Sequence, residues 1–168
     1  YMSNGTRMSQ EEKEEMKKTK SVIYWLFAAY VLLMLWLLFG QRMGVTAPGT
    51  YWDQISSRIN LIPLHTITEF WNNLHGGGRS HAFINLAGNV VMFVPLGFFI
   101  PYVFRKADSF RHSMIYALIT IVCIEIIQLV TLLGSLDVDD LILNMIGVVI
   151  GYLIYRLAAR LLKGTTHE

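Results

Sequence analysis

The stretch Glu125–Asn144, EIIQLVTLLGSLDVDDLILN, brings acidic and amide side chains into an otherwise strongly apolar part of the chain. A carboxyl group in a low-dielectric pocket can reach the pKa that general acid or base catalysis needs. Three aspartates within four residues could also hold a hard cation such as Mg²⁺ or Ca²⁺, which prefers oxygen ligands, or attract a basic ligand. We take as candidate catalytic residues the four carboxylic acids Glu125, Asp137, Asp139 and Asp140. A divalent cation is the only cofactor that they suggest, and its identity stays open.

Amide side chains recur at helical spacing near these acids. The spaced pairs are Asn85 with Asn89, Glu125 with Gln128, and Asp140 with Asn144. Residues three or four apart lie on one face of a helix, so each pair can point two polar groups in the same direction. The candidate ligand-binding residues are the four amides and two residues that precede them in the chain: Asn85, Asn89, Gln128, Asn144, Arg79 and His81.

Each of these residues also has a purely structural interpretation. Asparagine and glutamine commonly join transmembrane helices through hydrogen bonds of about 0.6 to 2 kcal/mol. Asp137 and Asp139 precede an apolar run, where a carboxylate can cap the free N–H groups of a helix N-terminus. His81 can be an exposed loop residue. Glu125 has the weakest structural explanation, because an amide would join two helices at a lower cost than a carboxyl group.

The apolar runs that must position these residues are long enough to cross a membrane. Hydrophobic residues make up 54% of the 168 residues and charged residues 15%, whereas soluble domains carry about 25% charged residues. A membrane-spanning helix needs roughly 20 mainly apolar residues, and the runs 21–40, 82–104, 113–133 and 141–162 qualify. The sequence therefore predicts an all-α membrane protein. Its four-helix transmembrane bundle covers 21–162, between a charged tail at 1–20 and a short tail at 163–168.

The cationic residues predict how this bundle is oriented. Eleven of the fourteen Lys and Arg residues lie in the N-terminal tail, in the connection 105–112 and near the C-terminus. Because these residues accumulate on the cytoplasmic side of a membrane, we expect a multi-pass plasma-membrane protein with both termini in the cytoplasm. Since the positive charge lies where topology requires it, we expect no nucleic-acid partner.

Three polar residues fall at a similar depth in this orientation. Counted at 1.5 Å per residue from the outer end of each span, Asn89 and Glu125 lie about 12 Å deep and Asn144 about 10 Å deep. Ionisable groups inside a membrane face the interior of a bundle or a wet cavity. The sequence therefore predicts one polar site that opens outward and is shared by the second, third and fourth spans.

The outer segment 51–75 is too polar to span but contains several apolar and aromatic residues. This composition predicts an interfacial or re-entrant segment at the level of the lipid headgroups, interrupted at Pro63. His65 and Glu69 are four residues apart and could pair on one helix face.

Prolines and glycines shape the second and fourth spans. Pro95 and Pro101 each remove a backbone hydrogen bond, so we expect a kinked or locally broken second span. Gly147 and Gly151 form a small-xxx-small pair, which is typical of a helix-packing face.

Four motifs, taken in order, resemble those of a known family. They are NLIPLHTI at 60–67, NLAGNVVMFVPLGFFIP at 85–101, EIIQL at 125–129 and LDVDDLILNMIGVVIGY at 136–152. Together they resemble the VanZ-like family across residues 59–155. The resemblance implies a small polytopic envelope protein associated with low-level resistance to glycopeptide antibiotics of the teicoplanin type. Family members often carry an arginine shortly before the D-x-D-D stretch, where this sequence has LGSL at 133–136.

The residues and the resemblance leave three functions open. The first is an outer-face membrane enzyme acting on a lipid-linked envelope precursor, with Glu125 as general acid or base. The second is a non-catalytic binder of membrane lipid or of a lipid-linked cell-wall precursor. Such a binder would change how a lipid-bearing glycopeptide antibiotic anchors at the surface, and Trp52, Phe70 and Trp71 would then matter more. The third is a small lipid transporter, which would have to be an oligomer because one chain offers only four spans.

Overall fold

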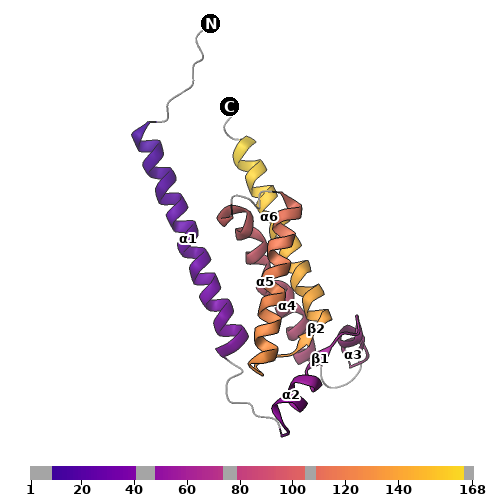
Figure 1. The fold of residues 1–168 in the computed structure, drawn as a ribbon. Helices are drawn as coiled ribbons and strands as arrows, with labels where there is room; N and C mark the ends of the chain where they lie inside the picture. Colours follow the sequence, from indigo (N-terminus) through magenta and orange to yellow (C-terminus); the bar gives the residue numbers. More distant parts are fainter. Residues whose placement is uncertain (1–8, 41–47, 74–78, 105–108, 165–168) are drawn as a thin grey trace.

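The computed structural model describes residues 9–40, 48–73, 79–104 and 109–164. Its long helices are α1 (Gln10–Phe39), α4 (Arg79–Val103), α5 (Phe110–Val130) and α6 (Val138–Gly164). The segment between α1 and α4 forms α2 (Tyr51–Ser57), β1 (Ile59–Asn60) and α3 (His65–Asn73), and β2 (Leu136–Asp137) precedes α6. Figure 1 shows the four long helices running alongside one another.

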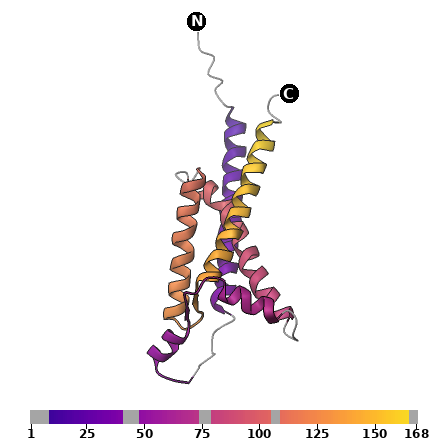
Figure 2. The ribbon, with the colours of Figure 1, turned by 90° about the vertical axis from the view of Figure 1, so that its right-hand side faces the viewer.

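Each long helix contains a segment apolar enough to cross a membrane. These segments are Lys13–Phe39, Leu86–Val103, Phe110–Val130 and Val138–Leu161. Helix α1 begins and α6 ends at one end of the bundle, whereas α2, α3 and the two strands lie at the other end (Figures 1 and 2). We call this second end the loop end. The predicted all-α membrane fold with four transmembrane helices is confirmed.

Helices α4 and α6 pack so closely that glycines of each touch the backbone of the other. A Cβ atom added at Gly97 would overlap the carbonyl oxygen of Val148. One added at Gly151 would overlap that of Val94, and Gly147 is equally crowded. Small residues allow helix backbones to approach in this way. The packing face predicted at Gly147 and Gly151 is confirmed, and Gly97 supplies its counterpart on α4.

The buried core lies mainly between α4, α5 and α6. Its most deeply buried apolar side chains are Phe93, Ile100, Ala117, Ile121 and Val148. Among the described residues of α1, only Met34 and Leu38 join this core. Helix α1 therefore lies at the margin of the bundle and exposes most of its apolar side chains, as a lipid-facing helix does.

Helix α4 continues through its first proline. Its helical course runs uninterrupted from Arg79 past Pro95 and ends at Val103, two residues after Pro101. The expected local break is therefore not observed. A proline removes a single N–H from the helical ladder, and the glycine-mediated packing against α6 holds the flanking turns in place.

The turn between α5 and α6 differs from the predicted span limits. Helix α5 ends at Val130 because Leu132 adopts a left-handed conformation with φ 57°, and the N–H groups of Leu133 and Gly134 both bond to the Gln128 carbonyl. Helix α6 begins at Val138, earlier than predicted, because Asp137 Oδ1 accepts the N–H of Asp139 at 2.8 Å. This bond caps the N-terminus of α6.

A short parallel β-pairing closes the loop end. Strand β1 pairs with β2, with Ile59 opposite Leu136 and Asn60 opposite Asp137. The Leu136 N–H also bonds to the Arg58 carbonyl at 2.9 Å. The segment between the first two spans is thereby joined to the start of the fourth, a contact that the sequence analysis did not anticipate.

Candidate functional site

A carboxyl group and an amide meet inside the bundle between α5 and α6. Asn144 Nδ2 donates to Glu125 Oε1 at 3.4 Å. The two side chains expose only 5% (Glu125) and 3% (Asn144) of their surface. Within the described part of the chain, Asn144 Oδ1 accepts no hydrogen bond. The pair therefore leaves a buried amide oxygen that can accept a hydrogen bond from a ligand.

A second polar contact lies on α4 and α6, about one helical turn nearer the loop end. Asn89 Nδ2 donates to Asp140 Oδ1, and Asp140 lies four residues before Asn144 on α6. The polar residues of α4, α5 and α6 thus form two neighbouring pairs, Asn89 with Asp140 and Glu125 with Asn144. We call the four residues Asn89, Glu125, Asp140 and Asn144 the polar cluster.

Gln128 belongs to a different contact. Its Nε2 donates to the Leu38 carbonyl at 3.2 Å and is buried. Leu38 lies in the last turn of α1, where carbonyl groups have no partner within their own helix. Gln128 therefore joins α5 to the end of α1, which is the structural interpretation of a membrane amide.

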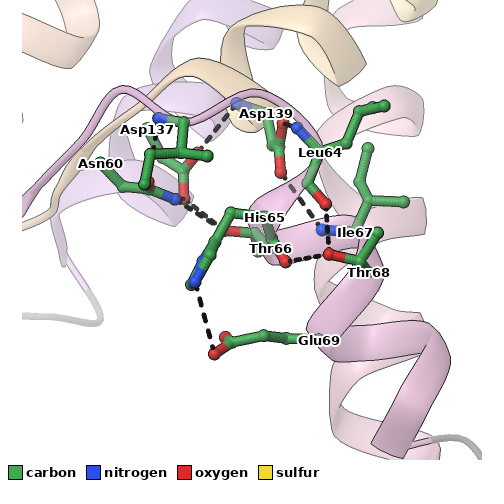
Figure 3. Close-up of polar contacts among 10 residues, drawn as sticks. Asn60, Leu64, His65, Thr66, Ile67, Thr68, Glu69, Asp137 and Asp139 are labelled. Carbon is green, nitrogen blue, oxygen red and sulfur yellow. Dashed lines mark hydrogen bonds and ion pairs between the residues drawn. The ribbon is translucent and has the colours of Figure 1, made fainter.

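The Asp139 carboxylate fastens the outer segment to the bundle. This side chain is fully buried, and its two oxygens accept the backbone N–H of Leu64 at 2.6 Å and that of Ile67 at 3.2 Å (Figure 3). Both donors lie at the start of α3. Asp139 therefore caps α3 from a distant part of the chain, although it is itself in the first turn of α6.

Asp137 strengthens the same attachment through side chains. Its Oδ2 accepts the hydroxyl of Thr66 at 2.7 Å and the amide Nδ2 of Asn60 at 3.2 Å (Figure 3). Asp137 thus binds β1 and α3 while its other oxygen caps α6. We call the hydrogen bonds that Asp137 and Asp139 make to residues 60–67 the latch.

The latch uses oxygens that a cation would need. Three of the four carboxylate oxygens on Asp137 and Asp139 accept backbone N–H groups, and the fourth accepts two side-chain donors. In the ranges that the structure describes, no three His, Cys, Asp or Glu side chains converge as a metal site would require. The arrangement therefore gives these two aspartates a positioning role.

The turn that leads into α3 is strained and contains Leu64, one of the residues bound by the latch. Leu64 has φ 64°, and the His65 N–H bonds back to the Ile62 carbonyl at 3.3 Å, which closes a turn over Pro63 and Leu64. A left-handed conformation costs a residue with a Cβ about 1–2 kcal/mol. The hydrogen bond from Leu64 to Asp139 holds the residue in that conformation. The pairing that the spacing of His65 and Glu69 allows is observed, with His65 Nε2 and Glu69 Oε1 3.8 Å apart on the exposed side of α3 (Figure 3).

An arginine does approach the LGSL stretch, but from another part of the chain. Arg58 follows α2, and its guanidinium donates to the carbonyls of Leu132 at 2.7 Å and Gly134 at 3.3 Å. These carbonyls lie just beyond the end of α5. Arg58 thus caps the turn before β2.

Three predicted ligand-binding residues, Arg79, His81 and Asn85, lie in the first turns of α4. Their side chains fall outside the described part of the structure.

The partners of the acidic turn were not predicted from the sequence. Asn60, Thr66 and Arg58 all belong to the outer segment, for which the sequence pattern indicates only membrane contact and a pairing of His65 with Glu69. One signal was present, since Asn60 and Thr66 are polar residues within the largely apolar motif NLIPLHTI. Nothing in the local pattern indicates that the partner lies 71 to 77 residues away.

Comparison with known proteins agrees with these features. The chain is 25% identical over 134 residues to Protein VanZ of Enterococcus faecium, which covers 79% of this chain and 73% of the relative. No solved structure matches the chain. The family model described as VanZ/LLP1 matches residues 27–159, which include α4, α5, most of α6, the latch and the polar cluster. This membrane protein therefore belongs to the VanZ/LLP1 family.

Proposed function

We propose that this chain is a plasma-membrane protein of the cell envelope that contributes to resistance against glycopeptide antibiotics of the teicoplanin type. Its loop end faces the cell exterior, and both termini are cytoplasmic. The polar cluster binds a lipid-linked or cell-wall ligand from the outer side. Membership of the VanZ/LLP1 family supports the resistance role, and the distribution of Lys and Arg supports the orientation.

The buried contact between Glu125 and Asn144 is the observation that carries this proposal. A carboxyl group inside a membrane-spanning segment is costly and marks a functional site by default. Joining α5 to α6 does not need a carboxyl group, because an amide would serve at a lower cost. The amide oxygen of Asn144 adds an acceptor that no described residue uses.

Binding is favoured over catalysis by the latch. Asp137 and Asp139 are engaged in positioning α3, which favours a structural role for them over one as acid, base or cation ligand. Glu125 and Asp140 remain as carboxylic acids of the polar cluster. Two alternatives stay testable. One is a membrane enzyme that acts on a lipid-linked envelope precursor. The other is a small lipid transporter, which would move a fluorescent lipid across the membrane of proteoliposomes.

The test is teicoplanin susceptibility in a sensitive host that expresses variants at equal membrane levels. E125Q and N144L should both lower the protection that the wild-type chain gives. E69Q removes an exposed carboxylate of α3 and should leave protection unchanged. Full protection by E125Q and N144L would refute a ligand site at the polar cluster.

The orientation has its own test. In a C123A background, a membrane-impermeant maleimide applied to intact cells should label S56C in α2 but not K17C near the start of α1. Both positions are exposed, so the reverse labelling pattern would show that the loop end is cytoplasmic.

Exposed apolar residues of the outer segment favour a second way of protecting the cell. The exposed fractions of Trp52, Leu61 and Ile62 are 74%, 66% and 63%. Large apolar side chains at this level suit contact with the lipid headgroup region. Here the chain would shield the membrane surface against a lipid-anchored antibiotic. W52S should then abolish protection while E125Q keeps it, which is the opposite of the result expected above.

A further inference from the structure

A groove between α1 and α4 opens sideways out of the bundle. Its volume is about 440 Å³, and its walls include Leu33, Met34 and Leu37 of α1 and Gly88, Val91 and Pro95 of α4. At its rim, Leu33 exposes 54% and Val91 67% of the side chain. Because both helices are membrane-spanning, this opening faces the hydrocarbon of the bilayer.

The groove lies within the leaflet at the loop end. Leu37 and Tyr30 lie two and nine residues before Phe39, the last residue of α1, so along α1 the groove runs from about 3 to about 14 Å below the loop end. Along α4, the lining residues from Gly88 to Pro95 extend over seven residues, which is the same length of about 11 Å. One leaflet of hydrocarbon is about 15 Å thick, half of a core of about 30 Å, so the groove fits within one leaflet.

The inner end of the groove is fixed, whereas its outer end is open. Tyr30 donates its hydroxyl to the Met92 carbonyl at 2.9 Å, which holds its ring against α4. A Cβ atom added at Gly88 would meet nothing within 4 Å. This contrasts with Gly97, Gly147 and Gly151, where the same addition would overlap backbone. Gly88 therefore leaves space that no described side chain fills.

We propose that this groove holds one acyl chain of a membrane lipid from the leaflet at the loop end. The inference rests on the proposed function, because it assigns a lipid as the ligand of the polar cluster. Apolarity alone would give no preference, since bulk lipid is as apolar as the groove. Two features favour a bound acyl chain over exchanging bulk lipid. The groove has a fixed shape, and one of its lining residues, Gly88, directly precedes Asn89 of the polar cluster.

A photolabelling experiment tests this assignment. The full chain is placed in phosphatidylcholine nanodiscs containing a small fraction of phosphatidylglycerol with a diazirine in the middle of its acyl chain. After irradiation, mass spectrometry locates the labelled residues. We expect several-fold more label on Leu33 and Val91 than on Leu32, which is at least as exposed as either but does not line the groove.

Gly88→Leu provides the matched perturbation, because its Cβ atom would meet nothing within 4 Å and its side chain would extend into the groove. It should lower labelling of Leu33 and Val91 several-fold. The control is Ala28→Leu, which adds the same bulk at an exposed position of α1 and should leave labelling unchanged. Equal labelling of Leu32 and Leu33 in the wild-type chain, or labelling that G88L does not change, would overturn the acyl-chain site.

Two further outcomes separate the possible failures. In a C123A background, a disulfide between two copies carrying V91C would show that a second chain covers the groove, and it would overturn the lipid assignment. If G88L removes the groove label while E125Q keeps full protection against teicoplanin, the acyl-chain site stands and the proposed function fails. If E125Q loses protection while the label is unaffected by G88L, the polar cluster stands and the acyl-chain site fails.

Discussion

Removing the Asp139 carboxylate should release α3 from the bundle. The side chain is fully buried and accepts two backbone N–H groups, those of Leu64 and Ile67. A hydrogen bond to a charged group contributes about 1.5 kcal/mol, so losing both in D139A should cost about 3 kcal/mol. This corresponds to a roughly 100-fold rise in the local opening constant of α3. D139N keeps one acceptor oxygen and should raise opening roughly tenfold.

Hydrogen exchange measured by mass spectrometry in nanodiscs provides the assay. The peptide that covers the start of α3 should exchange faster in D139A than in D139N, and faster in D139N than in the wild-type chain. Glu69→Gln is the control, because this carboxylate lies on α3 but its side chain is exposed and, within the described ranges, pairs with His65 alone. Equal exchange in D139A and E69Q would refute the latch as the force that positions α3.

Gly151→Ala should destabilise the bundle by about 1–3 kcal/mol, because its methyl group would overlap the Val94 carbonyl, and this loss should lower the midpoint of thermal unfolding. Leu64→Gly should slow exchange in α3, because it relieves a left-handed strain of about 1 kcal/mol; faster exchange would contradict that strain. The Thr50 hydroxyl and backbone N–H donate to Asp53 and hold the pKa of its carboxyl group below the usual value of 3.8. Since a lowered pKa stabilises only the ionised form, this cap of α2 should persist above pH 3.8 and be lost as pH falls through the lowered value. T50V should bring the pKa of Asp53 back toward its usual value in an NMR titration.

The sequence was sufficient to predict the spans and the central polar contact. Apolar runs of membrane-crossing length admit few interpretations other than membrane-spanning helices. A carboxyl group buried among such helices needs a polar partner on a neighbouring helix. Depth counted along the helices therefore brought Glu125 and Asn144 to the same level, where they form a hydrogen bond. The glycine pair on α6 was predictable for a similar reason, because close helix packing requires small residues at one spacing.

The role of the acidic turn could not be derived in the same way. A carboxylate before an apolar run suggests a cap on the helix that follows it, and Asp137 does cap α6. Asp139 has the same local setting but caps α3, because its partners are placed by the tertiary fold. The pairing of β1 with β2 also could not be predicted from the sequence, since two residues per strand are too few to produce a periodic pattern.

The latch also has a consequence for biogenesis. Leu64 is separated from Asp139 by 75 residues, so the outer segment is synthesised long before its carboxylate partner leaves the ribosome. During that interval the α3 region lacks the carboxylate that caps it in the finished fold. The start of the last span therefore completes the structure of the loop end, and a chain truncated before it would leave α3 without this partner.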